Sequence, residues 1–180
     1  MEPSMIPSHL NLLTAPERRI PRWTVADPRV AKIVPYTPRG GKPTSAQAAG
    51  LKYEAAFLAF ARRQWGPNFI TFTDQQIIYS DRVEGWKTCR PDGVLFIEDT
   101  FTVFEVKTRH TEAAWWQLWK LYIPVLQLLY PHRRPIAVEV TKSFDPTEPF
   151  PPPVHHISTS ELLLGDPFKA SGVNILQWNS

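Results

Sequence analysis

The chain has 180 residues, 43% of them hydrophobic, with a net charge of +3 at pH 7, which fits one globular domain and excludes disorder throughout. Its single cysteine, Cys89, excludes an internal disulfide and a cysteine zinc cluster and fits a reducing compartment. The sequence shows neither an apolar run as long as a membrane span nor a signal-peptide pattern, so we expect a cytoplasmic protein that does not contact a membrane.

Residues 1–44 form a proline-rich, basic segment. They contain eight prolines, and residues 1–45 carry seven basic and three acidic side chains. Proline fixes φ and removes a hydrogen-bond donor, so we expect an extended arm that lies across the body or on a partner. The charge suits a DNA backbone, contacted through Arg18, Arg19, Arg22 and Lys42, although an arm that only solubilises the chain would have the same composition.

A helix is predicted from Thr44 or Ser45 to about Trp65. Thr44 and Gln47 have the spacing of a capping box, and Gly66 and Pro67 end the helix. Within it, Glu54 lies beside apolar positions. A buried glutamate without a partner is costly. Glu54 therefore either binds a metal or cationic partner or extends outward to solvent.

The remaining pattern predicts an α/β fold. The expected elements are strands at 69–73 and 76–79, a polar connection at 81–87, a helix from Thr111 to about Tyr130 bent near Pro124, a strand at 135–141, a proline-rich linker at 145–153, a short helix from Ser160 and a last strand at 174–178. We therefore divide the chain into the arm at 1–44, a core at 45–142, and a linker with a C-terminal segment packing on the core at 143–180.

The stretch from Arg90 to Lys107 is expected to form the centre of the core. Two apolar runs, 94–97 and 101–106, flank a polar turn and predict a β-hairpin. Side chains alternate along a strand, so Glu105 and Lys107 project from one face. Asp92 precedes the first strand, between a proline and a glycine. The hairpin should thus bring Asp92, Glu105 and Lys107 together, and the crowded carboxylates favour a cation between them.

This hairpin resembles the PD-(D/E)xK nuclease superfamily. Pro91 and Asp92 match the first half of its motif, and Glu105, Val106 and Lys107 match the second half. The resemblance implies a restriction-endonuclease-like core, with a mixed central sheet flanked by helices. It also implies that Asp92, Glu105 and the carbonyl of Val106 hold Mg²⁺, with Mn²⁺ as a substitute, while Lys107 orients or deprotonates the attacking water.

The resemblance assigns two further residues. Many of these nucleases carry a glutamate on the first core helix that completes the metal site, and Glu54 has that placement. Some relatives carry a glutamine on the second helix with an aromatic residue four positions later. Gln117 matches the glutamine, but Leu121 occupies the aromatic position and Tyr122 comes one residue later. This departure leaves the role of Tyr122 open.

The order of motifs over residues 18–142 is similar to that in the endonuclease subunit of heteromeric cut-and-paste transposases (TnsA-like). The matching pieces lie at 19–25, 53–58, 74–77, 91–92 and 105–107. This resemblance implies hydrolysis of DNA by an endonuclease, bacterial or phage-encoded, with a protein partner docked on the arm or the C-terminal tail. A phage or repair exonuclease shares the same elements and remains an alternative.

Two other interpretations are consistent with the Asp92 and Glu105–Lys107 motif. An acid-x-Lys triplet occurs roughly once by chance in a chain of this length, so the hairpin could be an ordinary solvated one. Alternatively, the fold could be a non-cleaving module for DNA binding or assembly in a phage or transposon complex. The joint presence of Glu54, Asp92, Glu105 and Lys107 favours the enzyme, because a binding module would not need all four.

Overall fold

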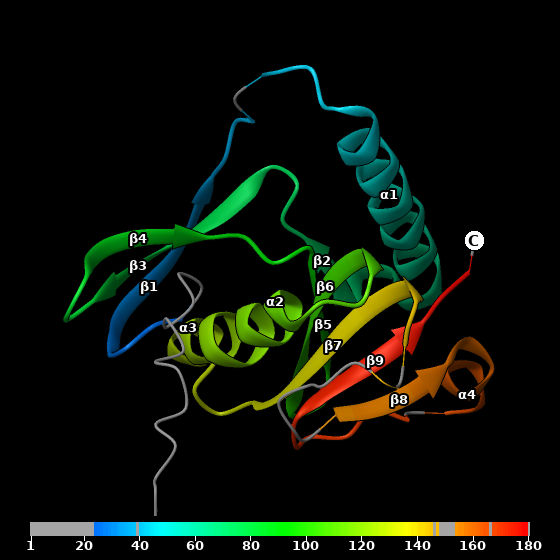
Figure 1. Ribbon diagram of the computed structural model, residues 1–180. Helices are drawn as coiled ribbons and strands as arrows, with labels where there is room; N and C mark the ends of the chain where they lie inside the picture. Colours follow the sequence, from blue (N-terminus) through cyan, green and yellow to red (C-terminus); the bar gives the residue numbers. More distant parts are fainter. Residues whose placement is uncertain (1–23, 39, 146, 148–153, 166, 180) are drawn as a thin grey trace, which may run out of the picture.

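A six-stranded sheet and a separate three-stranded sheet organise the chain (Figure 1). The computed structural model describes residues 24–38, 40–145, 147, 154–165 and 167–179. The elements are β1 Pro28–Pro35, α1 Ser45–Trp65, the 3₁₀ turn η1 Gly66–Asn68, β2 Phe69–Thr71, β3 Gln75–Asp81, β4 Gly85–Cys89, β5 Gly93–Ile97, β6 Thr100–Arg109, α2 Glu112–Trp116, the π-helix η2 Gln117–Tyr122, α3 Ile123–Leu129, β7 Arg134–Ser143, β8 Val154–Ser158, α4 Thr159–Leu164 and β9 Val173–Gln177.

The larger sheet is mixed. Its strand order is β2-β5-β6-β7-β9-β8. Strands β2, β5 and β6 pair antiparallel, whereas β6, β7, β9 and β8 pair parallel. The predicted hairpin is confirmed as β5 and β6, and residues 154–177 extend the sheet by two strands. The predicted α/β class, with a mixed central sheet flanked by helices, is therefore confirmed.

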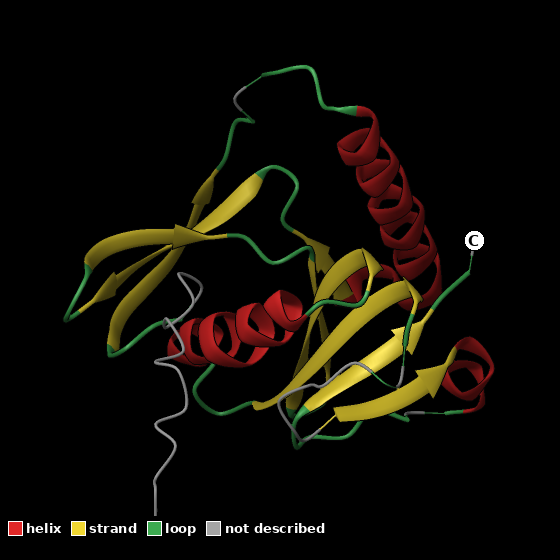
Figure 2. Ribbon diagram, viewed as in Figure 1, coloured by secondary structure: helices red, strands yellow, loops and turns green. Residues whose placement is uncertain are grey.

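Helices cover both faces of this sheet (Figure 2). Along β6, Phe104 and Val106 belong to the buried cluster that includes Phe57 of α1. Phe101 and Val103 point to the opposite face of the strand and belong to the cluster formed with α2, η2 and α3. The β5–β6 hairpin is thus enclosed between two helical layers, and polar groups on β6 are removed from water except where the sheet ends.

Helix α1 begins and ends where the sequence predicts. Thr44 Oγ1 accepts from the amide of Gln47 at 3.3 Å, and Gln47 Oε1 accepts from the amide of Thr44 at 2.8 Å, completing the capping box. The helix ends at Gly66, whose φ of 56° is a conformation that glycine adopts without steric cost.

The second predicted helix is present, but its irregularity is a π turn ahead of Pro124. The amide of Ile123 donates to the carbonyl of Leu118, five residues back. Proline has no N–H to give to the carbonyl of Lys120, and that carbonyl instead accepts from the amide of Val25 at 3.0 Å. The π turn and Pro124 thus create the point at which the N-terminal segment attaches to the helix.

The polar connection predicted at 81–87 is wrong, because this stretch belongs to the hairpin of β3 and β4. Gly85, at φ 79°, permits the tight turn. Residues of β4 alternate between an outward face with exposed Trp86 and an inward face with buried Cys89. Because the residues on the outward face are exposed, the sequence of this strand resembles a polar connection. Strand β1 completes this sheet in the order β1-β3-β4, so part of the predicted arm is a paired strand.

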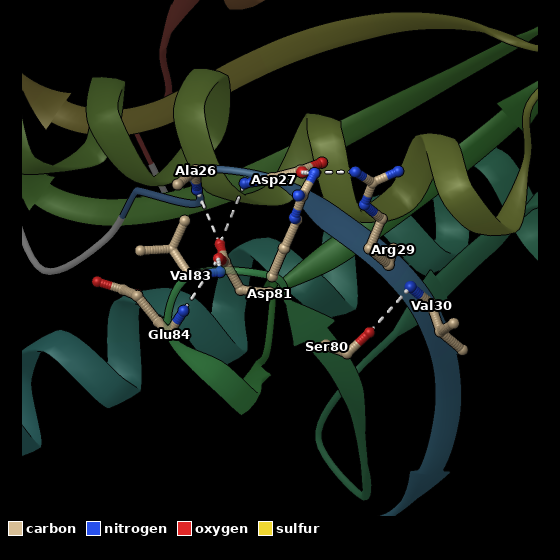
Figure 3. Close-up of polar contacts among 9 residues, drawn as sticks. Ala26, Asp27, Arg29, Val30, Ser80, Asp81, Val83 and Glu84 are labelled. Atoms are coloured by element: carbon tan, nitrogen blue, oxygen red, sulfur yellow. Dashed lines mark hydrogen bonds and ion pairs between the residues drawn. The ribbon is translucent and has the colours of Figure 1, made fainter.

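Asp81 fastens the three-stranded sheet (Figure 3). Its carboxylate accepts from the amides of Ala26 and Val83, each at 2.8 Å, and from those of Asp27 and Glu84 at 3.4 and 3.2 Å. Burial alone would raise the pKa of Asp81, but these backbone hydrogen bonds outweigh burial and lower it. One buried side chain therefore joins the β3–β4 turn to the segment that enters β1.

Part of the sequence predictions falls outside the described residues. The arm before residue 24 and most of the proline-rich linker at 145–153 are in this category. In the part of the chain that is described, no helix combines the length and apolar character needed to cross a membrane.

Candidate active site

Asp92 is held at the end of the hairpin by backbone contacts on both sides. Its amide donates to the carbonyl of Phe104 at 3.2 Å, and its carbonyl accepts from the amide of Phe72 at 3.4 Å. The next residue is Gly93, where an added Cβ would lie 2.4 Å from the ring of Phe69, so only glycine fits without a shift. Asp92 Oδ2 accepts from the amide of Val106 at 2.6 Å. This bond fixes the carboxylate against β6.

Glu105 and Lys107 lie two residues apart on β6, and the Lys107 ammonium contacts Glu105 Oε1. Glu105 is buried, with 3% exposure, and its Oε2 has no hydrogen-bond partner among the described residues. Burial raises the pKa of Glu105, and the Lys107 ammonium only partly offsets this. A buried carboxylate oxygen without a partner is costly, and the neighbouring Tyr122 hydroxyl acts only to lower the pKa of Glu105.

Glu54 and Asp92 complete an acidic cluster with Glu105. Burial raises the pKa of Glu54, and the Glu105 carboxylate raises it further. Burial also raises the pKa of Asp92 well above its ordinary value, and both glutamates add to the rise despite the bond from Val106. Glu54 is half-buried and lines two clefts, one of them shared with Asp92. The structure brings all three predicted carboxylates together from α1, the segment before β5, and β6.

Lys107 carries its proton in this setting. Burial acts to lower the pKa of Lys107, but the carboxylates of Glu105, Asp92 and Glu139 outweigh that effect and leave the pKa raised. The side chain also lines a cleft of about 550 Å³ beside Val106 and Thr108. The site therefore presents a protonated amine to any group entering this cleft.

The second helix brings Tyr122 close to the carboxylates. The hydroxyl of Tyr122 donates to the carbonyl of Arg90 at 3.2 Å, directly before Pro91 and Asp92. Burial raises the pKa of Tyr122, followed by the charges of Glu105 and Asp92. Gln117 is half-buried, and its side chain makes no hydrogen bond or ion pair within the described residues.

The π turn explains the one-residue offset between Gln117 and the aromatic position. In a π-helix the repeating hydrogen bond joins residues five apart instead of four. Tyr122, five residues after Gln117, therefore takes the place that the fourth residue would take in an α-helix. Nothing in the composition of residues 117–122 signals this extra residue, so the sequence alone could not predict the π turn.

A second buried polar pair lies beside the site and was not predicted. His110 Nδ1 and Glu139 Oε2 are 2.6 Å apart, and Glu139 Oε1 accepts from the amide of Thr111 at 3.1 Å. Glu139 is paired with Glu105 across the parallel strands β6 and β7. Burial raises the pKa of Glu139, which the nearby His110 partly offsets. The available signal was a glutamate inside the apolar run of 136–140.

The predicted DNA-binding residues divide into two groups. Arg18, Arg19 and Arg22 lie outside the described residues. Lys42 is described, is exposed, and lines the same cleft as Lys107. The structure adds one basic residue that sequence reasoning missed: Arg90, which lines a neighbouring cleft of about 230 Å³ with Glu54 and Asp92.

The donor set of the site suits a hard divalent cation, but the ligands are not prearranged. Among the residues with described positions, no group of three or more His, Cys, Asp or Glu side chains is set to hold a metal ion. The three carboxylates and the unpartnered Glu105 Oε2 nevertheless form an all-oxygen environment whose mutual repulsion a cation would relieve. Comparisons with family models, curated proteins and solved structures gave no significant match to this chain.

Proposed function

We propose that this protein is a Mg²⁺-dependent deoxyribonuclease with a site of the PD-(D/E)xK type on a restriction-endonuclease-like core. The observation that carries the proposal is the convergence of Glu54, Asp92 and Glu105 beside a protonated Lys107, at the edge of an open cleft. Carboxylates that raise one another's pKa lower the stability of the folded protein unless a bound cation neutralises their charge. Groups with such perturbed pKa values, when they lie in a cleft, are typical of catalytic sites.

Each residue has a role in this proposal. Asp92, Glu105, Glu54 and the carbonyl of Val106 would hold the ion. When bound, Mg²⁺ supplies an acidified water and a counter-charge for the scissile phosphate. Lys107, which carries its proton, orients the attacking water and contacts the phosphate oxygens. The hydroxyl of Tyr122 holds the Arg90 carbonyl, which positions the segment that bears Asp92.

The finer assignment is strand cleavage by an endonuclease, TnsA-like or phage or repair in type. Under this proposal the protein acts in the cytoplasm on DNA, and the proline-rich arm or the C-terminal tail would bind a protein partner. The support is the resemblance over residues 18–142 together with the open cleft, which admits a strand from the side.

A non-cleaving module is the second candidate, because one observation favours it. The described acidic residues do not form a prearranged set of three metal ligands. In such a module, the Lys107–Glu105 contact would be permanent and the acidic cluster would be a remnant that contributes nothing to hydrolysis.

A plasmid-nicking assay separates the two candidates. Wild type would be incubated with supercoiled plasmid in Mg²⁺, Mn²⁺ or EDTA, beside Asp92→Ala and Lys107→Ala. Lys87→Ala is the matched control, since Lys87 forms an ion pair with Glu84 on the three-stranded sheet. We expect nicking in both metals, none in EDTA, loss in both site variants and no change in the control. DNA binding without nicking under any metal would support the module and refute the enzyme.

A further inference from the structure

Two clefts meet at the acidic cluster. The larger, of about 550 Å³, contains Lys42, Val106 and Lys107, and the smaller, of about 230 Å³, contains Arg90 and Asp92. Both clefts are lined by Leu51 and Glu54 of helix α1. The carboxylates therefore lie where one continuous path along the surface would pass from the first cleft to the second.

Each cleft carries one exposed cation that has no carboxylate partner among the described residues. Lys42 lines the larger cleft, and Arg90 lines the smaller one. Neither forms an ion pair in the described part of the chain, in contrast to Lys107, which contacts Glu105. The Arg90 charge is nevertheless near enough to the cluster to act on the pKa of Glu54 in the lowering direction.

Arg90 is held in place at both ends. Its guanidinium lies over the ring of Tyr36, 4.1 Å from the ring centre. Its backbone carbonyl accepts from the hydroxyl of Tyr122 at 3.2 Å. The amide of Tyr36 in turn donates to the carbonyl of Asp74 at 2.8 Å, next to the pairing of β1 with β3. An exposed arginine that is positioned without a carboxylate is suited to an anion from outside the protein.

We propose that a single DNA strand lies across both clefts, with Lys42 and Arg90 each binding a phosphate on opposite sides of the phosphate that faces Asp92, Glu105 and Lys107. This inference rests on the proposed function, and it adds the path of the substrate and a second phosphate-binding residue, Arg90, beside Lys42. Tyr36 is the positioning residue for Arg90. The three-stranded sheet, which carries Tyr36 at its edge, thereby contributes to substrate binding.

DNA affinity measured without turnover tests this path. Binding of a short fluorescein-labelled single strand would be followed by anisotropy in Ca²⁺ at several salt concentrations, for wild type, Lys42→Ala and Arg90→Ala. Lys52→Ala and Arg63→Ala are matched controls, since both residues are exposed on α1 and line neither cleft. Each test variant should bind at least about threefold more weakly, and its salt dependence should be shallower by about 0.7 in logarithmic slope, the value for one lost phosphate contact.

Two substitutions of Tyr36 test whether its ring positions Arg90. Tyr36→Phe keeps the ring under the guanidinium and should bind DNA as wild type does, whereas Tyr36→Leu should bind as weakly as Arg90→Ala. In the cleavage assay, the leucine variant should raise KM more than it lowers kcat. Equal binding by Tyr36→Leu and wild type would remove Tyr36 from the proposal.

The outcomes distinguish this inference from the proposed function. If the wild type cleaves DNA but Lys42→Ala and Arg90→Ala bind with unchanged affinity and salt slope, the path is refuted while the nuclease stands. If both variants lose affinity and the wild type does not cleave DNA, the path stands as a binding groove and the nuclease is refuted. A wild type that binds no DNA refutes both.

Discussion

Asp92 is the residue at which burial, charge and hydrogen bonding oppose one another most directly. Burial and two neighbouring glutamates raise its pKa, whereas the amide of Val106 stabilises its charged form. A carboxyl group whose pKa is higher in the folded state than in the unfolded state destabilises the fold once it ionises. The penalty is absent below the ordinary pKa of 3.8 and grows as pH rises through the raised value.

Asp92→Asn should therefore separate activity from stability. Asparagine keeps an oxygen that can accept from Val106 but carries no charge, so at neutral pH and without metal we expect the free energy of unfolding to rise by about 1 kcal/mol and Tm by roughly 2–4 °C. Plasmid nicking should be abolished. Thermal melting by circular dichroism checks the first result, and a variant that unfolds would instead make Asp92 a structural residue.

Tyr122 is expected to act through Arg90 and Asp92. Tyr122→Phe removes the hydroxyl that donates to the Arg90 carbonyl and interacts with the Glu105 carboxylate, so stability should fall by about 1 kcal/mol. Loosening the segment before Asp92 should lower the nicking rate about tenfold. Tyr130→Phe is the matched control, because its hydroxyl makes no hydrogen bond within the described residues. Equal loss of activity in both variants would contradict a specific role for Tyr122.

At the scale of elements, the π turn links the second helix to the N-terminal segment. It precedes Pro124, and the missing N–H of that proline leaves the carbonyl of Lys120 to accept from Val25. The same element carries Tyr122 toward the site. One local departure from α-helical geometry thus serves both the docking of the chain that enters β1 and the placement of an active-site side chain.

Pro124→Ala tests the docking function of this element. The new amide of residue 124 can donate to the Lys120 carbonyl and compete with Val25. We expect the Val25 amide to exchange with deuterium about tenfold faster, a difference of about 1.4 kcal/mol in local opening, while amides in β6 keep their protection. NMR-detected hydrogen exchange measures both. Unchanged protection at Val25 would show that its bond to Lys120 does not depend on the proline.

The sequence predicted some elements well because their signals are local. The capping box at Thr44 and Gln47 and the terminator at Gly66 placed the start of α1 at Thr44 or Ser45 and its end at about Trp65, and α1 spans Ser45–Trp65. Strand β4 was missed because its outward face is solvated and its pairing partner β3 only becomes visible in three dimensions. Convergence of Glu54, Asp92 and Glu105 could be expected from the hairpin and the resemblance. The contact of Arg90 with Tyr36 could not, since it joins the residues that directly follow β4 and β1, which are distant in the sequence.

At the scale of the whole molecule, two sets of carboxyl groups act in opposite directions on stability. Burial, together with mutual repulsion at Glu54 and Asp92, raises the pKa values of the site carboxylates Glu54, Asp92 and Glu105. Burial acts to raise the pKa of Asp81, but backbone hydrogen bonds from Val83, Ala26 and Asp27 outweigh it and leave the pKa lowered. Ionisation of the site carboxylates costs stability, whereas ionisation of Asp81 contributes it.

The metal-free protein should therefore become more stable as pH falls from neutral toward the ordinary carboxyl pKa values, since the site carboxylates take up protons at their raised pKa values. Below the ordinary pKa of 3.8, the contribution of Asp81 is lost as pH falls through its lowered value. Mg²⁺ should remove the first effect, because a bound cation keeps the carboxylates ionised. Melting temperatures across pH with and without Mg²⁺ measure this. A Tm that falls steadily as pH is lowered over this range without metal would contradict it.

The proposed site requires one cation that Glu54, Asp92 and Glu105 share. Titration of Mn²⁺, followed by the electron paramagnetic resonance signal of the free ion, measures this directly in wild type, Glu105→Gln and the exposed control Glu112→Gln. We predict saturable binding of one ion per chain in the wild type and the control, and at least tenfold weaker binding in Glu105→Gln. Equal Mn²⁺ affinity in Glu105→Gln and wild type, or no bound ion in the wild type, would contradict the proposed site.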